Sequence, residues 1–242
     1  MPATSLQICS PLSKVDVLIL CGGKGTRLSQ VIKDKPKSLA PIKGKPFLDI
    51  LVEDLLQQGF RRIIFCVGYL KEQIIERYLS RTDAEFFFSE EEDLLGTGGA
   101  INNALPMISS NTFFVINGDS LCPVEFKDFY HFHRSKAAKA SFVLSSVNDH
   151  YDGGIVKLDE TLRIQSFMEK SALVSQNGGF INSGIYILEK EFLEFEDLAP
   201  IFSLEYDLFP LLIKKNSCYG FVVKSNLVDI GTPERYIKIN DE

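Results

Sequence analysis

Four short apolar runs in the first half of the chain restrict the folds available to it. They read VDVLIL (15–20), RIIFCV (62–67), AEFFFS (84–89) and TFFVIN (112–117). Runs of this length and composition suit strands that are buried on both faces. The amphipathic segment between the first two runs begins with a proline and ends with a glycine, as helices often do. This alternation predicts an α/β fold with a mostly parallel sheet, right-handed crossovers and flanking helices.

The second half of the chain has more strand-like runs, separated by short polar breaks. We expect these runs to add a mixed β region to the same sheet, and they lie at 139–147, 153–159, 163–170, 178–188 and 218–223. Segment 206–215 is expected to be partly helical, and 232–240 to be a terminal helix capped by Thr232. No linker or repeat interrupts the pattern. We therefore expect a loose tail over 1–14 and a single domain over 15–242.

Composition excludes several classes of protein. The net charge of −6 argues against a general nucleic-acid binder, although a few cations focused in one cleft can still bind a polyanion. The five scattered cysteines indicate reduced thiols and no zinc site. The first residues lack the features of a signal peptide, and no apolar run is long enough for a membrane span. We expect a cytoplasmic protein without nucleic-acid or membrane partners, and the sequence leaves a homo-oligomer open.

The first predicted strand runs directly into the glycine-rich stretch CGGKGTRL (21–28). Glycines at such a position let backbone N–H groups face a ligand, and an arginine beside them can hold phosphate oxygens. The stretch matches neither the P-loop, because Gly25 follows Gly23-Lys24, nor the dinucleotide fingerprint, because Leu28 stands in place of its third glycine. An ordinary strand-to-helix turn is the alternative to an anion-binding loop.

A basic, proline-containing segment follows and favours the binding loop over the ordinary turn. DKPKSLAPIKGKP (34–46) places Lys35, Lys37, Lys43 and Lys45 among prolines that stiffen the backbone. A rigid basic loop beside a glycine loop is typical of a site for a polyanion.

These two stretches together resemble the signature of the sugar-1-phosphate nucleotidyltransferases, which join an NTP to a sugar 1-phosphate and release pyrophosphate. The resemblance runs from about Val15 to the end of the chain. It continues, in the family's order, through LLGTGGAI (94–101), NGDS (117–120), EK (169–170), NSGIYIL (182–188) and DIGTPERY (229–236). Within the family, GTGGA, NGD and SLEYDLFP look most like the D-glycero-D-manno-heptose 1-phosphate guanylyltransferases, followed by the mannose 1-phosphate guanylyltransferases.

The resemblance implies a Rossmann-like, GT-A-like nucleotidyltransferase fold with a mostly parallel central mixed sheet flanked by helices. The active site would lie at the carboxyl ends of the central strands. The favoured reaction transfers GMP from GTP to the heptose 1-phosphate, for surface polysaccharide biosynthesis. Use of UTP, CTP or dTTP, or of another sugar 1-phosphate, stays open. So does a non-catalytic module that senses nucleotide sugars.

Site residues follow from the positions that match the family's motifs. For the nucleotide they are Leu20, Gly22, Gly23, Gly25, Thr26, Gly96 and Gly98. Arg27, Lys37 and Asp119 are the expected catalytic residues. Family members often have glutamine before the second glycine motif and GTAGA within it. This chain has Glu90, Glu91 and Glu92 in the preceding stretch, where we expect solvated acids, with Glu90 as a weak candidate for reading the base.

Metal and sugar-phosphate residues are assigned in the same way. Asp119 follows a buried strand, where a carboxylate needs a partner or a cation, and Asp229 follows another apolar stretch. The resemblance implies that this pair holds Mg²⁺, which accepts few carboxylates together with phosphates and waters. The residues expected to bind the sugar phosphate are Gly154, Glu169, Lys170 and Asn182.

Overall fold

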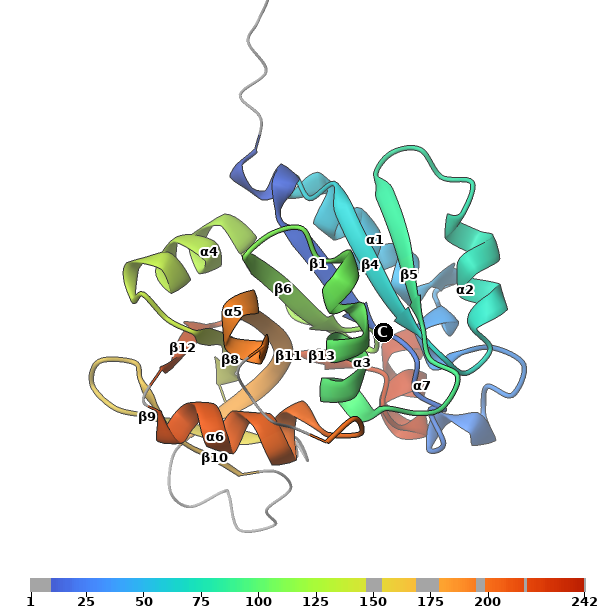
Figure 1. Ribbon diagram of the computed structural model, residues 1–242. Coiled ribbons are helices and arrows are strands. Elements are labelled where there is room, and N and C mark those ends of the chain that lie inside the picture. The colour runs from blue at the N-terminus through green and yellow to red at the C-terminus, as the bar shows by residue number, and fades with distance from the viewer. Residues whose placement is uncertain (1–9, 147–153, 169–178, 195–198, 216, 242) are drawn as a thin grey trace, which may run out of the picture.

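A nine-stranded mixed sheet forms the centre of the computed structural model, which describes residues 10–146, 154–168, 179–194, 199–215 and 217–241. Figure 1 shows the sheet crossing the molecule between layers of helices. Its strands run in the order β10-β9-β11-β6-β1-β4-β5, with β8 paired to β11 and β12 paired to β8. Their bounds are β1 (Asp16–Leu20), β4 (Arg62–Val67), β5 (Glu85–Glu90), β6 (Thr112–Asn117), β8 (Ala140–Ser146), β9 (Ile155–Leu158), β10 (Ile164–Met168), β11 (Phe180–Glu189) and β12 (Cys218–Val223).

Strands β1, β4, β5 and β6 are parallel, so their carboxyl ends meet at one edge of the sheet. Strand β11 is antiparallel to β6, β8 and β9, and its register with β8 shifts between Asn182 and Tyr186. The predicted mixed sheet with a parallel centre is therefore confirmed. The four apolar runs of the first half coincide with parallel strands within one residue. Burial on both faces holds for β1, β4 and β6, whereas β5 is an edge strand whose residues are mostly half-buried or exposed, so that expectation is wrong for the run at 84–89.

Helices cover both faces of the sheet, because neighbouring residues of each central strand point to opposite sides. Val17 and Ile19 of β1 pack in the core beneath α1, α2 and α4, whereas Leu18 packs in the core beneath α3 and α6. The helices are α1 (Phe47–Gln57), α2 (Lys71–Tyr78), α3 (Gly96–Ala104), α4 (Phe126–Ser135), α5 (Lys190–Glu194), α6 (Phe209–Lys214) and α7 (Pro233–Asp241). In the part of the chain that the structure describes, no helix has the length and apolar character needed to cross a bilayer.

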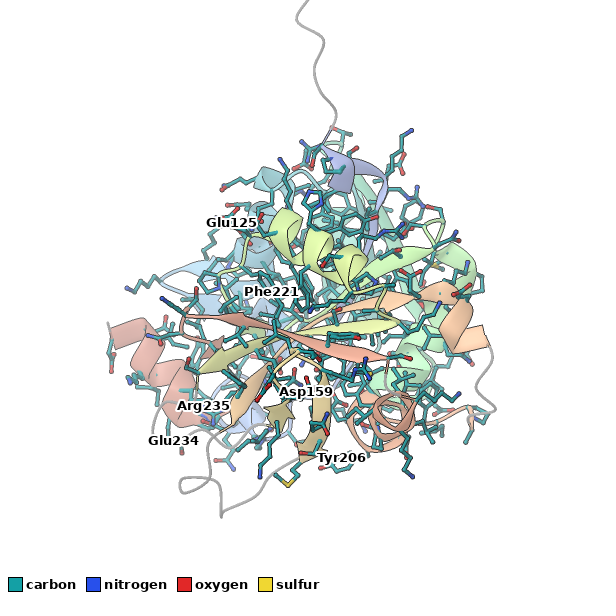
Figure 2. The ribbon with its side chains drawn as sticks, turned by 90° about the vertical axis from the view of Figure 1, so that its left-hand side faces the viewer. Glu125, Asp159, Tyr206, Phe221, Glu234 and Arg235 are labelled. Atoms are coloured by element: carbon teal, nitrogen blue, oxygen red, sulfur yellow. The ribbon has the colours of Figure 1, made fainter. Side chains whose placement is uncertain are left out.

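The outer strand β12 is held against α4 by aromatic contacts. The ring of Phe221 lies 5.4 Å from that of Phe129 and 5.3 Å from that of Phe132, measured between centroids. Figure 2 shows Phe221 on this strand beneath α4, which begins directly after Glu125. Such ring pairs add to the stability gained from apolar burial alone.

A smaller core joins the basic loop to the C-terminal helix. Leu28, Ala40 and Phe47 pack there with Ile230 and Tyr236. The Tyr236 hydroxyl donates a hydrogen bond to the carbonyl of Pro41 at 2.9 Å. Two short ladders accompany this core, β2 (Pro41–Ile42) with β3 (Lys45–Pro46) and β7 (Ser120–Leu121) with β13 (Val228–Asp229). Residues from both ends of the chain are thereby fixed beside the carboxyl ends of the central strands.

Asp16, at the first position of β1, is a fully buried carboxylate with a complete set of partners. It accepts hydrogen bonds from the backbone N–H groups of Ser109 and Ser110 at 2.9 and 2.7 Å, and it pairs with Arg62 at 2.9 Å. Burial alone would raise the pKa of Asp16, but the hydrogen bonds from Ser110, Arg62 and Ser109 outweigh burial and lower it. The ionised form is therefore the one that stabilises the fold.

We expect Asp16→Ala to lower the free energy of unfolding by about 3–5 kcal/mol at pH 7, because it leaves buried donors without an acceptor. The pKa of Asp16 is lower in the folded chain, so the contribution of the carboxylate is complete above the unfolded value of 3.8 and is lost as the pH falls through the folded value. Urea unfolding at pH 7 and near pH 3 measures this. An equal difference between the free energies of unfolding of wild type and variant at both pH values would contradict this prediction.

Candidate active site

Glycines stand at the carboxyl ends of three neighbouring strands, where backbones from different segments approach closely. A Cβ atom on Gly68, after β4, would lie 2.9 Å from the carbonyl oxygen of Gly22, and one on Gly118, after β6, would lie 2.8 Å from that of Leu20. One on Gly22, after β1, would lie 2.7 Å from Oε1 of Glu91. Side chains at these positions would push the segments apart, so glycine lets the loops assemble into one compact edge.

The glycine-rich loop after β1 lies directly against the stem of Lys37. Gly25 has a φ angle of +57°, and a Cβ on it would lie 2.9 Å from Cβ of Lys37. Gly23, Thr26 and Arg27 are exposed on the outer side of this loop. A small pocket in front of the loop is lined by Lys24, Gly25, Leu28, Ser29, Ile32, Lys35, Lys37 and Tyr69. The loop and the basic segment therefore form one cationic surface, as the sequence predicted.

Lys37, Asp119 and Asp229 meet at the end of β6, although they come from distant parts of the chain. The ammonium of Lys37 lies 2.5 Å from Oδ2 of Asp119. The position that a Cβ on Gly231 would take lies 3.3 Å from the Lys37 ammonium and 2.6 Å from Oδ1 of Asp229. The ladder of β7 and β13 fixes this arrangement, because the N–H of Ile230 donates to the carbonyl of Asp119 at 3.1 Å.

Each of the two aspartates also has a cationic partner. Lys37 pairs with Asp119, and the guanidinium of Arg235 lies 3.1 Å from Oδ2 of Asp229. The sequence prediction missed Arg235, which stands six residues after Asp229 in the DIGTPERY motif, at the start of the predicted terminal helix. The two cations hold both carboxylates at the same edge of the sheet.

The possible metal ligands at this edge suit a hard divalent cation. The carboxylates of Asp119 and Asp229 supply the oxygen ligands that such a cation prefers. Within residues 10–146, 154–168, 179–194, 199–215 and 217–241, no group of three or more acidic, histidine or cysteine side chains could hold a metal on its own. A cation here would need further oxygen ligands from phosphates and water, which is the usual coordination of Mg²⁺.

Glu91 is buried, with 7% of its surface exposed, so the expectation that it is a solvated acid is wrong. Its N–H continues the β4–β5 ladder by donating to Val67 at 2.8 Å, which turns its side chain inward. Oε2 accepts the N–H of Leu95 at 3.0 Å, while Oε1 lies beside Gly22. Glu90, one residue earlier, points outward and pairs with Lys71 at 2.8 Å. Buried and exposed residues do not alternate regularly along β5, so the local sequence contained no signal that would have identified Glu91.

The second glycine motif begins α3. Gly96 has a φ angle of +76°, and the N–H groups of Gly98 and Gly99 donate to the carbonyl of Phe202 at 3.0 and 3.2 Å. This turn lies next to Glu91 through Leu95. The assignment of Gly96 and Gly98 to the nucleotide stays a prediction.

Two of the residues expected to bind the sugar phosphate lie together near β11. The N–H of Asn182 donates to the carbonyl of Gly154 at 2.9 Å, and its side-chain amide donates to the hydroxyl of Tyr186 at 2.7 Å. Glu169 and Lys170 lie outside the described residues. The roles of all four residues stay predictions.

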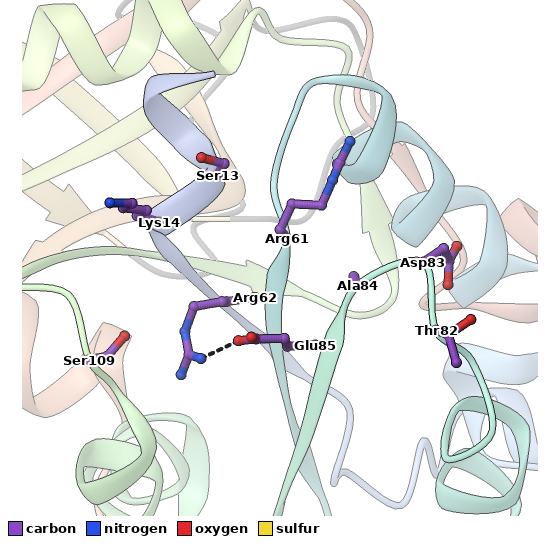
Figure 3. Close-up of a pocket in the computed structure, with 9 residues that line it drawn as sticks. All are labelled: Ser13, Lys14, Arg61, Arg62, Thr82, Asp83, Ala84, Glu85 and Ser109. Atoms are coloured by element: carbon purple, nitrogen blue, oxygen red, sulfur yellow. Dashed lines mark hydrogen bonds and ion pairs between the residues drawn. The ribbon is translucent and has the colours of Figure 1, made fainter. Parts of the chain in front are cut away.

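A separate hollow of about 720 Å³ opens at the opposite, amino-terminal edge of the sheet. Figure 3 shows Lys14 at one side of the residues that line this hollow, Thr82 and Asp83 at the other, and the pair formed by Arg62 and Glu85 between them. It lies at the start of β1, β4 and β5, so the central sheet separates it from Lys37 and Asp119. The hollow is therefore no part of the candidate active site.

We expect Glu91→Gln to stabilise the protein relative to wild type at pH 7. Burial raises the pKa of Glu91, and the hydrogen bond from Leu95 opposes that rise without cancelling it. Because the folded-state pKa lies above the unfolded value of 4.5, ionisation opposes folding, and its cost grows as the pH rises through this window. Thermal unfolding at pH 4 and pH 7 measures the difference, with Glu90→Gln as an exposed control. A wild type that is the more stable protein at pH 7 would contradict it.

Comparison with known proteins gives consistent matches along the chain. A family model described as Nucleotidyl transferase matches residues 16–242. The chain is similar to the D-glycero-alpha-D-manno-heptose 1-phosphate guanylyltransferase of Aneurinibacillus thermoaerophilus, with 34% identity over 94% of this chain and 98% of the relative. It is also similar to the protein of the same name from Campylobacter jejuni, with 35% identity over 92% of this chain and 97% of the relative.

Other matches are longer proteins or solved structures. The Mannose-1-phosphate guanylyltransferase of Mycobacterium tuberculosis is 33% identical over 93% of this chain, which spans 63% of that relative. The crystal structure of HddC from Yersinia pseudotuberculosis is 37% identical, covers 94% of this chain and 98% of its own, and has a TM-score of 0.82. A second structure of HddC, complexed with GMP-PN, is 36% identical over the same shares of the two chains and has a TM-score of 0.80.

Proposed function

We propose that this chain, which belongs to the nucleotidyl transferase family, transfers GMP from GTP to a sugar 1-phosphate and releases pyrophosphate. The preferred acceptor is D-glycero-D-manno-heptose 1-phosphate, followed by mannose 1-phosphate, and the product serves surface polysaccharide biosynthesis. One observation carries the proposal: Lys37, Asp119 and Asp229 meet beside the glycine-rich loop at the carboxyl edge of the sheet. This edge is where open parallel sheets bind nucleotides.

Glu91 supports GTP as the nucleotide. Oε1 of this carboxylate lies beside Gly22, in the loop that we assign to the base and ribose. Guanine presents two adjacent donors, N1–H and the 2-amino group, on its pairing edge, and a carboxylate accepts such a pair. Adenine lacks both of these donors. The HddC structure described as complexed with GMP-PN is a similar protein with a guanine nucleotide analogue.

Catalysis of this reaction depends mainly on positioning the two substrates and on neutralising the negative charge of their phosphates. An oxygen of the sugar phosphate attacks the α-phosphorus of GTP in line, and the bond from that phosphorus to the bridging oxygen breaks, so that pyrophosphate leaves with the electron pair. The nucleophile is already an anion, so no general base is needed. Arg27 and Lys37 hold the phosphates against their mutual repulsion, together with Lys170.

Enzymes of this family generally use a divalent metal ion, and we propose that Asp119 and Asp229 hold Mg²⁺. The bound ion supplies positive charge to the phosphate oxygens. Lys37 and Arg235 keep the two carboxylates in position at the edge of the sheet. An ammonium has three donors, so Lys37 can bind Asp119 and phosphate oxygens together.

The heptose acceptor is favoured over mannose by the extent of the matches. The chain spans 97–98% of the two relatives named for heptose 1-phosphate but 63% of the mycobacterial relative named for mannose 1-phosphate. Asn182 and Gly154 are the described residues that we assign to the sugar phosphate, and the assignment of Glu169 and Lys170 rests on their sequence motif.

A matrix of four NTPs against heptose, mannose, glucose and N-acetylglucosamine 1-phosphates, with Mg²⁺, tests the reaction directly. We expect pyrophosphate release to be fastest with GTP and heptose 1-phosphate. Chelation of the metal should stop the reaction. Binding of GTP without pyrophosphate release for any acceptor would instead support a module that senses nucleotide sugars.

Replacing single charged groups should reduce turnover without unfolding the protein. Asp119→Ala and Arg27→Ala are each expected to lower kcat by about 10²–10³, as the loss of one preorganised electrostatic contact commonly does. Asp128→Ala and Lys127→Ala on the exposed side of α4 are the matched controls. Near-normal turnover in Asp119→Ala would contradict the assignment.

The Glu91→Gln variant should lose its preference for GTP and keep its fold. We expect kcat/KM for GTP to fall by about 10–10² because a hydrogen bond to a charged group is worth about 1.5–3 kcal/mol. The values for the other NTPs should change little. Equal losses for all four nucleotides would show that Glu91 does not read the base.

A further inference from the structure

A segment from the C-terminal half lies across the entry to α3, and we call it the strap (residues 200–208). The N–H of Phe202 donates to the carbonyl of Leu95 at 3.0 Å, and the carbonyl of Phe202 accepts from Gly98 and Gly99. The first N–H groups of a helix have no partner within the helix. Here a residue about a hundred positions further along the chain supplies the acceptor.

The glycines of the GTGGA motif are all in contact with this strap. A Cβ on Gly96 would lie 2.5 Å from the carbonyl oxygen of Phe202, and one on Gly98 would lie 2.1 Å from the ring of Phe202. One on Gly99 would lie 2.7 Å from the carbonyl oxygen of Pro200. The alanine found at position 98 in the GTAGA form of the motif would collide with this ring. The close contact with the strap therefore explains why this chain has glycine at positions 96, 98 and 99.

Side chains fasten the strap to the same turn. The hydroxyl of Thr97 donates to Oε2 of Glu205 at 2.8 Å and accepts the N–H of Leu204 at 2.9 Å. Ser203 donates to the same carboxylate oxygen at 2.8 Å. The strap ends in a π-helical turn, Leu204–Leu208, a rare geometry that often occurs at functional sites.

Leu95 connects the strap to Glu91. Its N–H donates to the Glu91 carboxylate at 3.0 Å, and its carbonyl accepts the N–H of Phe202 at the same distance. We propose that the strap holds the Glu91 carboxylate in position for the base, so that Phe202 and Glu205 are positioning residues for nucleotide selection. This inference rests on the proposed function, in which Glu91 reads guanine.

A double-mutant cycle tests the contact between Phe202 and Gly98. Gly98→Ala alone should lower kcat/KM for GTP by about 10-fold, mainly through KM, because the added methyl group would collide with the Phe202 ring and shift the strap. In a Phe202→Ala background, the same change should cost less than about 2-fold, since the ring that it meets is gone. An equal cost in both backgrounds would mean that Gly98 contacts the nucleotide itself, and would overturn the proposal.

The Thr97–Glu205 contact is tested by Thr97→Val, which removes the hydroxyl at constant size, and by Glu205→Gln. We expect both variants to lower the preference for GTP over ATP by about 10-fold, the effect of losing roughly 1.4 kcal/mol, with a smaller change in kcat. Thr97→Ser should restore it. Phe129→Leu, in the core on the other face of the sheet, is the control that lowers stability without changing the preference.

Hydrogen exchange of residues 91–99 in the free protein distinguishes two proposals: that the strap positions Glu91, and that Glu91 reads guanine. Faster exchange together with lost nucleotide preference in Thr97→Val supports the strap, and faster exchange with unchanged preference overturns it. Unchanged exchange also overturns it, because the strap would then not hold the turn. A wild type that does not discriminate between GTP and ATP refutes the role of Glu91 in the proposed function, whatever the exchange shows.

Discussion

The ion pair between Lys37 and Asp119 joins segments that are 82 residues apart in the chain, and much of the site depends on it. The stem of Lys37 supports the glycine-rich loop at Gly25, and its ammonium lies between Asp119 and the turn that carries Asp229. The glycine-rich loop, the basic segment and the two aspartates, which were recognised separately in the sequence, thus form one charged surface. Its position follows from the parallel register of β1, β4 and β6, which brings their carboxyl ends to one edge.

The surroundings of this pair explain why the chain needs its C-terminal part. The core formed by Leu28, Phe47, Ile230 and Tyr236 fixes the basic loop against α7, and Arg235 from the same helix pairs with Asp229. On the other side of the site, the strap contacts the turn that follows Glu91. Phe209, just after the strap, packs against Tyr186, whose hydroxyl accepts a hydrogen bond from Asn182. The proposed nucleotide and sugar sides are therefore connected through one packed segment.

Local pattern was sufficient for most of the fold and for part of the site. Apolar runs identified β1, β4 and β6 because burial on both faces leaves a strong signal, but the run at β5 belongs to a half-exposed edge strand. Charge and glycine content pointed to the glycine-rich loop that contains Gly25 and to the basic segment that contains Lys37. Glu91 was missed, since its burial depends on pairing with β4 and on the close approach of Gly22. The contact of Phe202 with Gly98 was missed for the same reason: two residues far apart in sequence share a space that neither segment indicates alone. The expected helix over 206–215 is in part a π-helical turn that begins earlier, at Leu204.

A crystal structure of the protein with GTP, Mg²⁺ and an unreactive sugar-phosphate analogue would show whether the carboxyl edge of the sheet binds both substrates. We expect the metal ion between Asp119 and Asp229, the triphosphate against Arg27 and Lys37, and the pairing edge of guanine on Glu91. A nucleotide bound in the hollow at the opposite edge of the sheet, or a guanine turned away from Glu91 with the metal ion distant from both aspartates, would contradict this expectation.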